Sequence, residues 1–186
     1  MNPTSNKSDF EDLTTNLRDL AYSYLERYSP SKQQLKVHLL KKYLTKIKGS
    51  KSKKEVTAII DEIISGLEKN KILDDGLYSD SKARMFLRRG YSLNKINQSL
   101  RNKGIDNKYI KQSIDKIKED EIEPDFVSAL KLCKRRRIGP LRPDANRELF
   151  YKKDMGILAR GGFSFDLSKR VLDLESNEFN KLIKII

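Results

Sequence analysis

The sequence has few of the residues that build disulfide frameworks or many tight turns. A single cysteine, Cys133, has no partner for an internal disulfide. The 186 residues include only 9 glycines and 5 prolines, which leaves little material for turns between many short strands. These shortages favour a helical protein and fit a reducing compartment.

Long apolar runs are also missing. The most apolar segments, residues 58–60 and 182–186, are too short or too interrupted by charge to cross a bilayer. The N-terminus lacks the basic flank, apolar run and small-residue cleavage site of a secretory signal. We therefore predict a cytoplasmic protein with no membrane span.

Residue types for catalysis and metal binding are scarce as well. The only histidine, His38, lies between apolar neighbours and far from Cys133, so it is expected to be a partly exposed structural residue. Cys133 is expected to be a small buried hydrophobe, because no base for a nucleophile is evident. Asp74 or Asp75 is well placed to cap a helix. The sequence thus predicts no enzymatic activity, no cofactor and no metal.

Positive charge, by contrast, is abundant and unevenly placed. The formal net charge is +13, and two segments carry essentially all of it. Residues 41–54 hold seven lysines and no acid, and residues 131–153 hold nine basic and two acidic residues. Such focusing favours contact with a polyanion or an acidic protein face over a uniformly basic surface. The alternative is a solvated lysine-rich loop or helix end.

Apolar residues recur at helical spacing along most of the chain. A first helix is expected over residues 17–28, and Ser31 with Gln34 has the form of a capping box for a second helix that carries Leu35 and Leu39. The pattern then repeats: Ala21, Ala83 and Ala129 stand 62 and 46 residues apart, and Leu39, Leu100 and Leu158 stand 61 and 58 apart. Short helices need stacked neighbours for a stable core, so this recurrence predicts an all-α protein of three tandem three-helix repeats.

The predicted organisation has five parts. Residues 1–15 are expected to be a disordered tail, 16–72 repeat 1 with a lysine-rich insertion, 73–123 repeat 2, 124–175 repeat 3 and 176–186 a C-terminal helical tail. Helix boundaries are expected at these residues: Gly90, Ser92, Gly104, Asp106, Asp125, Asp144, Gly161-Gly162, and Ser164 or Asp166. Changes in the offsets place the extra residues in the two basic segments, which therefore look like additions to a common helical scaffold.

Several motifs resemble those of the RecX family over roughly residues 17–175. In repeat 1 the resemblance rests on Ala21, Tyr24-Leu25, Arg27, Ser31, Leu35, Leu39 and Lys42. In repeat 2 it rests on Ile72-Leu73-Asp74-Asp75, Tyr78, Arg88-Arg89-Gly90, Ile96, Leu100 and Lys103-Gly104-Ile105. In repeat 3 it rests on residues 134–139 and on Leu158-Ala159-Arg160-Gly161-Gly162-Phe163-Ser164. It implies an elongated, curved helical array that lies in the groove of the RecA-DNA filament. There it would limit filament growth and reduce ATP hydrolysis and strand exchange.

The candidate binding residues are the cations of the second basic segment and those near the helix ends that carry the resemblance. They are Arg88, Arg89, Lys134, Arg135, Arg136, Arg137, Arg142, Lys152 and Arg160. The expected partner is RecA or its DNA filament, with direct contact to single- or double-stranded DNA possible, and the chain is expected to be a monomer. The alternative, based on charge alone, is a stand-alone nucleic-acid-binding protein without sequence preference.

Overall fold

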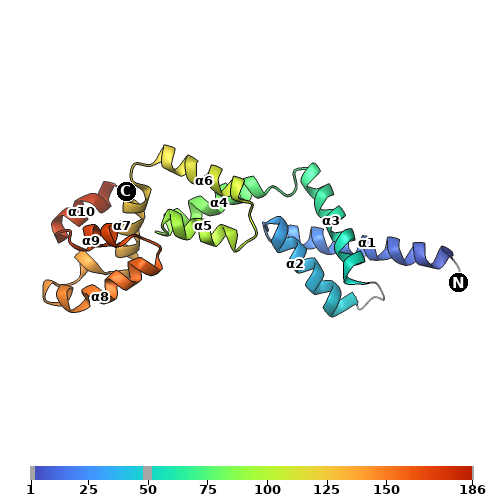
Figure 1. Ribbon diagram of the computed structural model, residues 1–186, viewed down its shortest axis with the longest axis horizontal. Coiled ribbons are helices and arrows are strands. Elements are labelled where there is room, and N and C mark those ends of the chain that lie inside the picture. Colours follow the sequence, from blue (N-terminus) through green and yellow to red (C-terminus); the bar gives the residue numbers. More distant parts are fainter. Residues whose placement is uncertain (1–2, 48–51, 186) are drawn as a thin grey trace. The chain divides into compact units, whose positions relative to one another are not determined.

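The computed structural model describes residues 3–47 and 52–185, in which helices dominate and no strand occurs (Figure 1). The α-helices are α1 (Pro3–Leu25), α2 (Lys32–Lys42), α3 (Lys53–Lys69), α4 (Asp75–Arg88), α5 (Leu93–Arg101), α6 (Asn107–Asp120), α7 (Pro124–Arg136), α8 (Asp144–Arg160), α9 (Phe165–Leu172) and α10 (Ser176–Ile185). A π-helical turn, η1 (Tyr43–Ile47), and a 3₁₀ turn, η2 (Gly139–Leu141), complete them. The all-α prediction is confirmed. No helix of the described ranges is long and apolar enough to span a membrane.

The chain divides into two compact units. Unit 1 consists of Met1–Tyr78 with Lys103–Ile105, and unit 2 of Ser79–Asn102 with Asp106–Ile186. The division falls inside α4 and so cuts across the second predicted repeat. The boundaries of the three repeats, and the elongated, curved array, therefore stay predictions.

The core of unit 1 lies between α1, α2 and α3, which contact one another in pairs (Figure 1). Its fully buried members come from all three helices: Leu17, Ala21, Leu35, Leu39, Val56 and Ile60. Burying each large aliphatic side chain stabilises the fold by about 1.5–3 kcal/mol. Helix α3 begins with a capping box in which Ser52 and Glu55 each bond the other's backbone N–H.

The N-terminal segment differs from the expected disordered tail over residues 1–15. Helix α1 already begins at Pro3, a residue type that the first position of a helix tolerates. Leu13 is 6% exposed and belongs to the core, one helical turn before Leu17 and two before Ala21. The expectation was wrong because the row of buried residues on α1 continues to Leu13, N-terminal to the closely spaced apolar residues that begin at Leu17. Residues 48–51 of the lysine-rich segment lie outside the described residues.

The main core of unit 2 gathers α7, α8, α9 and α10 around the turn η2. Leu130, Leu158, Val171 and Phe179, one from each helix, are at most 1% exposed. Helix α10 therefore contributes its aromatic ring to the core rather than trailing from it.

Most of the expected helix starts are confirmed. Ser31 and Gln34 form the capping box of α2, and Ser92, Asp106 and Ser164 cap α5, α6 and α9. One is wrong: Pro143, not Asp144, stands at the cap of α8, and no side chain caps that helix. Asp144 instead occupies the first turn, where its charge still complements the helix dipole.

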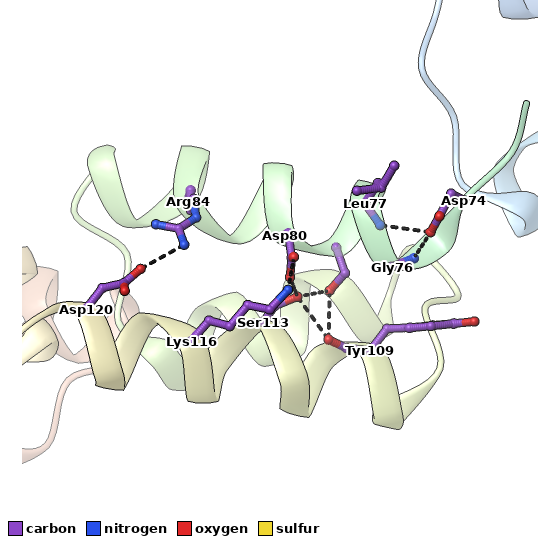
Figure 2. A network of polar contacts seen from close by, with 10 residues as sticks. Asp74, Gly76, Leu77, Asp80, Arg84, Tyr109, Ser113, Lys116 and Asp120 are labelled. Atoms are coloured by element: carbon purple, nitrogen blue, oxygen red, sulfur yellow. Dashed lines mark hydrogen bonds and ion pairs between the residues drawn. The ribbon is translucent and has the colours of Figure 1, made fainter. Parts of the chain in front are cut away.

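Within unit 2, a polar seam joins facing sides of α4 and α6 (Figure 2). Asp80 pairs with Lys116 and accepts a hydrogen bond of 2.6 Å from Ser113, and Arg84 pairs with Asp120 at 2.8 Å. Burial alone would raise the pKa of Asp80, but the hydrogen bonds from Lys116 and Ser113 outweigh it and hold that pKa below its ordinary value. The seam thus links α4 to α6 through polar contacts on their facing sides.

Cys133 is fully buried, as expected for a small hydrophobe. Burial, with a smaller contribution from the charge of Asp154, raises the pKa of its thiol to about 12. We expect a disulfide reagent at pH 8 to modify the native protein about a thousandfold more slowly than the unfolded protein, since the thiolate is the reactive form. Absorbance of the released thiol, with and without guanidinium, measures this. Equal rates would contradict the burial of Cys133.

Candidate functional site

The candidate site is a cleft of about 390 Å³ in unit 2, called here the basic cleft. Four cations line it: Lys95 from α5, Arg135 and Arg136 from the end of α7, and Arg160 from the end of α8. Its other lining residues are Gly90, Tyr91, Leu132, Ile157 and Gly161, so no carboxylate lies among them. The cleft thus presents four positive charges around a largely apolar floor.

Close packing at Gly90 brings α7 to the cleft. Gly90 follows α4 with φ +73°, and a Cβ built there would lie 2.8 Å from both the Leu132 nitrogen and the Ser128 oxygen of α7. Only glycine permits this approach of two backbones. The end of α4 therefore lies directly against the helix that carries Arg135 and Arg136.

Two hydrogen bonds, together called a joint here, fix the start of α5 against the end of α8 and the start of α7. The Ser92 hydroxyl caps α5 and also donates a hydrogen bond of 2.9 Å to the Gly161 carbonyl. The backbone N–H of Leu93 donates 2.7 Å to Asp125 Oδ1, at the start of α7. These contacts hold Lys95 and Arg160, on α5 and α8, at the same cleft.

Unit 1 contains a joint of the same design. The Ser31 hydroxyl donates 2.8 Å to the Lys103 carbonyl, and the Lys32 N–H donates 2.9 Å to Asp75 Oδ1. In both joints a capping serine binds the carbonyl just before a glycine with positive φ, Gly104 or Gly162, and the next residue's N–H binds an aspartate of a first helical turn. The serines and glycines were expected as local caps, but their tertiary partners were not.

Burial raises the pKa of both aspartates of these joints, although each accepts a backbone hydrogen bond that acts in the opposite direction. The sequence predicted that Asp74 or Asp75 caps α4 and that Asp125 lies at the start of α7. For α4 that role falls to Asp74, whose Oδ1 accepts hydrogen bonds from the N–H groups of Gly76 and Leu77 (Figure 2). Asp75 and Asp125 instead bind the N-terminus of another helix.

The structure brings together three of the nine predicted binding residues, Arg135, Arg136 and Arg160, in the basic cleft. Arg88 and Arg89 are exposed and immediately precede the cleft residue Gly90. Lys134 and Arg137 are exposed at the end of α7 but do not line the cleft. Sequence reasoning missed Lys95 and Tyr91, which lie outside the two basic segments and are brought to the cleft by the packing of helices distant in the sequence.

The remaining two predicted residues lie elsewhere in unit 2. Arg142 makes two hydrogen bonds, of 2.6 and 2.7 Å, to the buried carboxylate of Asp154 and lies 4.5 Å from the ring centre of Phe150. Those contacts give it an internal structural role. Lys152 lines a separate open pocket of about 780 Å³ with Arg147 and Glu148. A partner contact by either residue stays a prediction.

The cations of the basic cleft are available to a ligand. Within the described ranges, none of Arg135, Arg136 and Arg160 forms an ion pair with a carboxylate, and Lys95 bonds only the neutral amide of Gln98, at 3.3 Å. Guanidinium groups bind carboxylates and phosphates through paired N–H donors. The cleft can therefore bind an anionic partner, and no His, Cys, Asp and Glu cluster suited to a metal occurs among the described residues.

Comparisons with known proteins give a consistent class. No protein-family model matches the chain. The regulatory protein RecX of Myxococcus xanthus (strain DK1622) is 32% identical over 161 residues, which cover 86% of this chain and 85% of that protein. The regulatory protein RecX of Agrobacterium fabrum (strain C58) is 28% identical over 116 residues, 61% of this chain and 58% of that one.

The fold gives the same result. A crystal structure of regulatory protein RecX matches with a TM-score of 0.63 and 20% identity, over 94% of this chain and 79% of the other. The protein is thus an all-helical protein related to bacterial regulatory proteins. The chain belongs to the RecX family.

Proposed function

We propose that the protein is a cytoplasmic, monomeric, non-enzymatic regulator that binds RecA or its DNA filament. Bound there, it inhibits filament extension, ATP hydrolysis and strand exchange. The observation that carries the proposal is the unpaired basic cleft in a member of the RecX family. A filament of RecA on DNA offers acidic protein surface and phosphate, and either complements three arginines and a lysine.

A RecA assay tests this proposal directly. We expect the purified chain, added to RecA on single-stranded DNA, to slow ATP hydrolysis progressively as its concentration approaches that of RecA. Regulation by binding predicts that the effect saturates with filament occupancy. Unchanged hydrolysis with the chain in excess would reject the proposal.

Charge reversal at the basic cleft tests which surface acts. Arg135→Glu, Arg136→Glu and Arg160→Glu together should weaken inhibition at least tenfold, because each buried or oriented charge contact contributes about 1–3 kcal/mol. The matched control reverses Arg101, Lys111 and Lys181, which are exposed cations of unit 2 away from the cleft. Equal loss in both variants would show a general charge effect and remove the cleft from the proposal.

The second candidate function is sequence-independent nucleic-acid binding without RecA, favoured by the same cleft. It predicts tight DNA binding with a log-log salt slope of about −0.9 per phosphate contact on duplex DNA. It also predicts that the variant with all three cleft arginines reversed loses nearly all of that binding. The unmodified chain should leave ATP hydrolysis by RecA unchanged. Filament regulation instead predicts that the unmodified chain slows ATP hydrolysis by RecA.

A further inference from the structure

A second concave site lies in unit 1, where α1 ends beside α2. This pocket of about 450 Å³, called here the aromatic pocket, is lined by Leu20, Ser23, Tyr24, Arg27, Tyr28, His38 and Lys42. Three of its residues are aromatic, two are basic, and none is acidic. It therefore combines flat apolar rings with positive charge in one hollow.

The rings form a row in which Tyr24 and His38 are stacked and Tyr24 and Tyr28 are tilted. Tyr24 lies face to face with His38, with centroids 3.9 Å apart and planes at 17°, and Tyr28 lies 4.9 Å from Tyr24 at 40°. Tyr24 packs against the unit 1 core, whereas Tyr28 is 57% exposed. The row thus runs from two partly buried rings to an exposed ring.

His38 extends this row as an uncharged ring. Burial, followed by the charges of Lys42 and Lys41, lowers its pKa below the ordinary histidine value. The imidazole is therefore neutral at pH 7. The positive charge of the pocket comes from Arg27 and Lys42, and neither forms an ion pair with a carboxylate in the part of the chain that the structure describes.

The aromatic pocket occupies the position in the first predicted repeat that part of the basic cleft occupies in the third. Arg27 and Arg135 are 108 residues apart, which is the offset of Ala21 and Ala129. His38 and Ile157 are 119 apart, the offset of Leu39 and Leu158. The corresponding position, at the ends of two helices, is thus concave in both repeats. Only the first repeat lines it with a row of aromatic rings.

Core packing is the simpler explanation for the aromatic residues. It accounts for Tyr24 but not for Tyr28, which leaves more than half of its surface in solvent beside two unpaired cations. An exposed ring next to positive charge is the arrangement by which proteins bind single-stranded nucleic acid, with bases on the rings and phosphates on the cations. An acidic peptide would use the cations but would leave the ring unused.

We propose that the aromatic pocket binds one unpaired nucleotide, with the base stacked on Tyr28 and the phosphate held by Arg27 and Lys42. The nucleotide comes either from a single strand or from a free nucleoside phosphate. The site goes beyond filament regulation, because it requires no RecA. Its failure would leave the proposed function untouched, and a failed RecA assay would leave this site untouched.

The single histidine makes the test direct, because every imidazole NMR signal of the full chain comes from His38. Titration with a hexamer of deoxyadenosine at pH 7.5 should shift these signals saturably. A hexamer of abasic sugar phosphates should bind at least tenfold more weakly, since stacking contributes about 1–3 kcal/mol per base. Equal shifts from the two hexamers would overturn the proposal. An equal shift from polyglutamate would overturn it as well.

Two matched pairs of variants locate the contact. Tyr28→Ala, in the segment that follows α1, should weaken hexamer binding roughly tenfold, whereas Tyr22→Ala, on α1 and outside the pocket, should not. Arg27→Gln should lessen the salt dependence by about one phosphate contact, whereas Arg18→Gln should not. Equal effects within either pair would overturn the site.

The source of the nucleotide follows from a second ligand. If deoxyadenosine monophosphate shifts His38 with the affinity of the hexamer, the ligand is a free nucleotide. If the hexamer binds at least tenfold more tightly, the ligand is a strand that contacts the protein beyond one phosphate. No shift of His38 with either ligand at millimolar concentration would reject the proposal.

Discussion

Gly162→Ala should lower the free energy of unfolding by about 3 kcal/mol. Gly162 has φ +87°, and a residue with a Cβ costs about 1–2 kcal/mol in the left-handed region. The added Cβ would also lie 2.4 Å from Ser92 Oγ and 3.1 Å from the Lys95 nitrogen, and overpacking of this kind costs about 1–3 kcal/mol more. Urea unfolding followed by circular dichroism measures the change.

Gly156→Ala is the matched control, because Gly156 lies within α8 and its Cβ would meet only Arg160 Nη1, at 3.5 Å. Removing a glycine from a helix interior should stabilise the protein by about 0.5–1 kcal/mol. Ser92→Ala separates the two costs at Gly162, since it removes the colliding hydroxyl. In the Ser92→Ala/Gly162→Ala double variant, the loss should be smaller than the sum of the single losses. Strict additivity would show that the collision contributes nothing.

The caps and the buried faces of individual helices could be predicted from the sequence. Side chains that satisfy the backbone of their own helix follow from short-range chemistry, so the caps at Ser31, Ser92, Asp106 and Ser164 were correct. The buried rows of α2 and α5 follow from spacing alone. The start of α1 was not predicted in the same way, because polar residues directly flank Leu13 on both sides and its burial depends on the neighbouring helices.

Tertiary polar contacts could not be predicted, because their partners are far apart in the sequence. Asp125 bonds an N–H 32 residues away, and the serine of each joint bonds a carbonyl about 70 residues away. The candidate site shows the same limit. A run of four cations at the end of α7 marked the region, but the run alone does not show that Arg135 and Arg136 line the cleft while Lys134 and Arg137 do not.

The joints give the recurring serines and glycines a common physical reason. An offset of 61 between Ser31 and Ser92, and of 58 between Gly104 and Gly162, places equivalent partners in two separate contacts. Gly104 meets the same constraint as Gly162: its Cβ would lie 2.4 Å from that of Gln33. We infer that these positions are restricted by contacts between segments far apart in the sequence, beyond the needs of their own helices.

Asp154→Ala should also be strongly destabilising, by about 3–4 kcal/mol. The Asp154 carboxylate is 1% exposed, accepts the Gly139 N–H at 2.9 Å and binds the Arg142 guanidinium through both oxygens. Removing it leaves a buried N–H without an acceptor and a largely buried cation without its counter-charge, which is the costly way to break such a pair.

The control for Asp154→Ala is Asp120→Ala. Asp120 also pairs with an arginine, Arg84, at 2.8 Å, but both side chains are about half exposed, so water and salt screen the pair. Its loss should cost less than about 1 kcal/mol. Thermal unfolding of both variants measures the difference, and Asp154→Ala should lower the midpoint by about 10 °C for a chain of this length. Equal effects of the two substitutions would mean that the burial of Asp154 adds nothing to the strength of its ion pair.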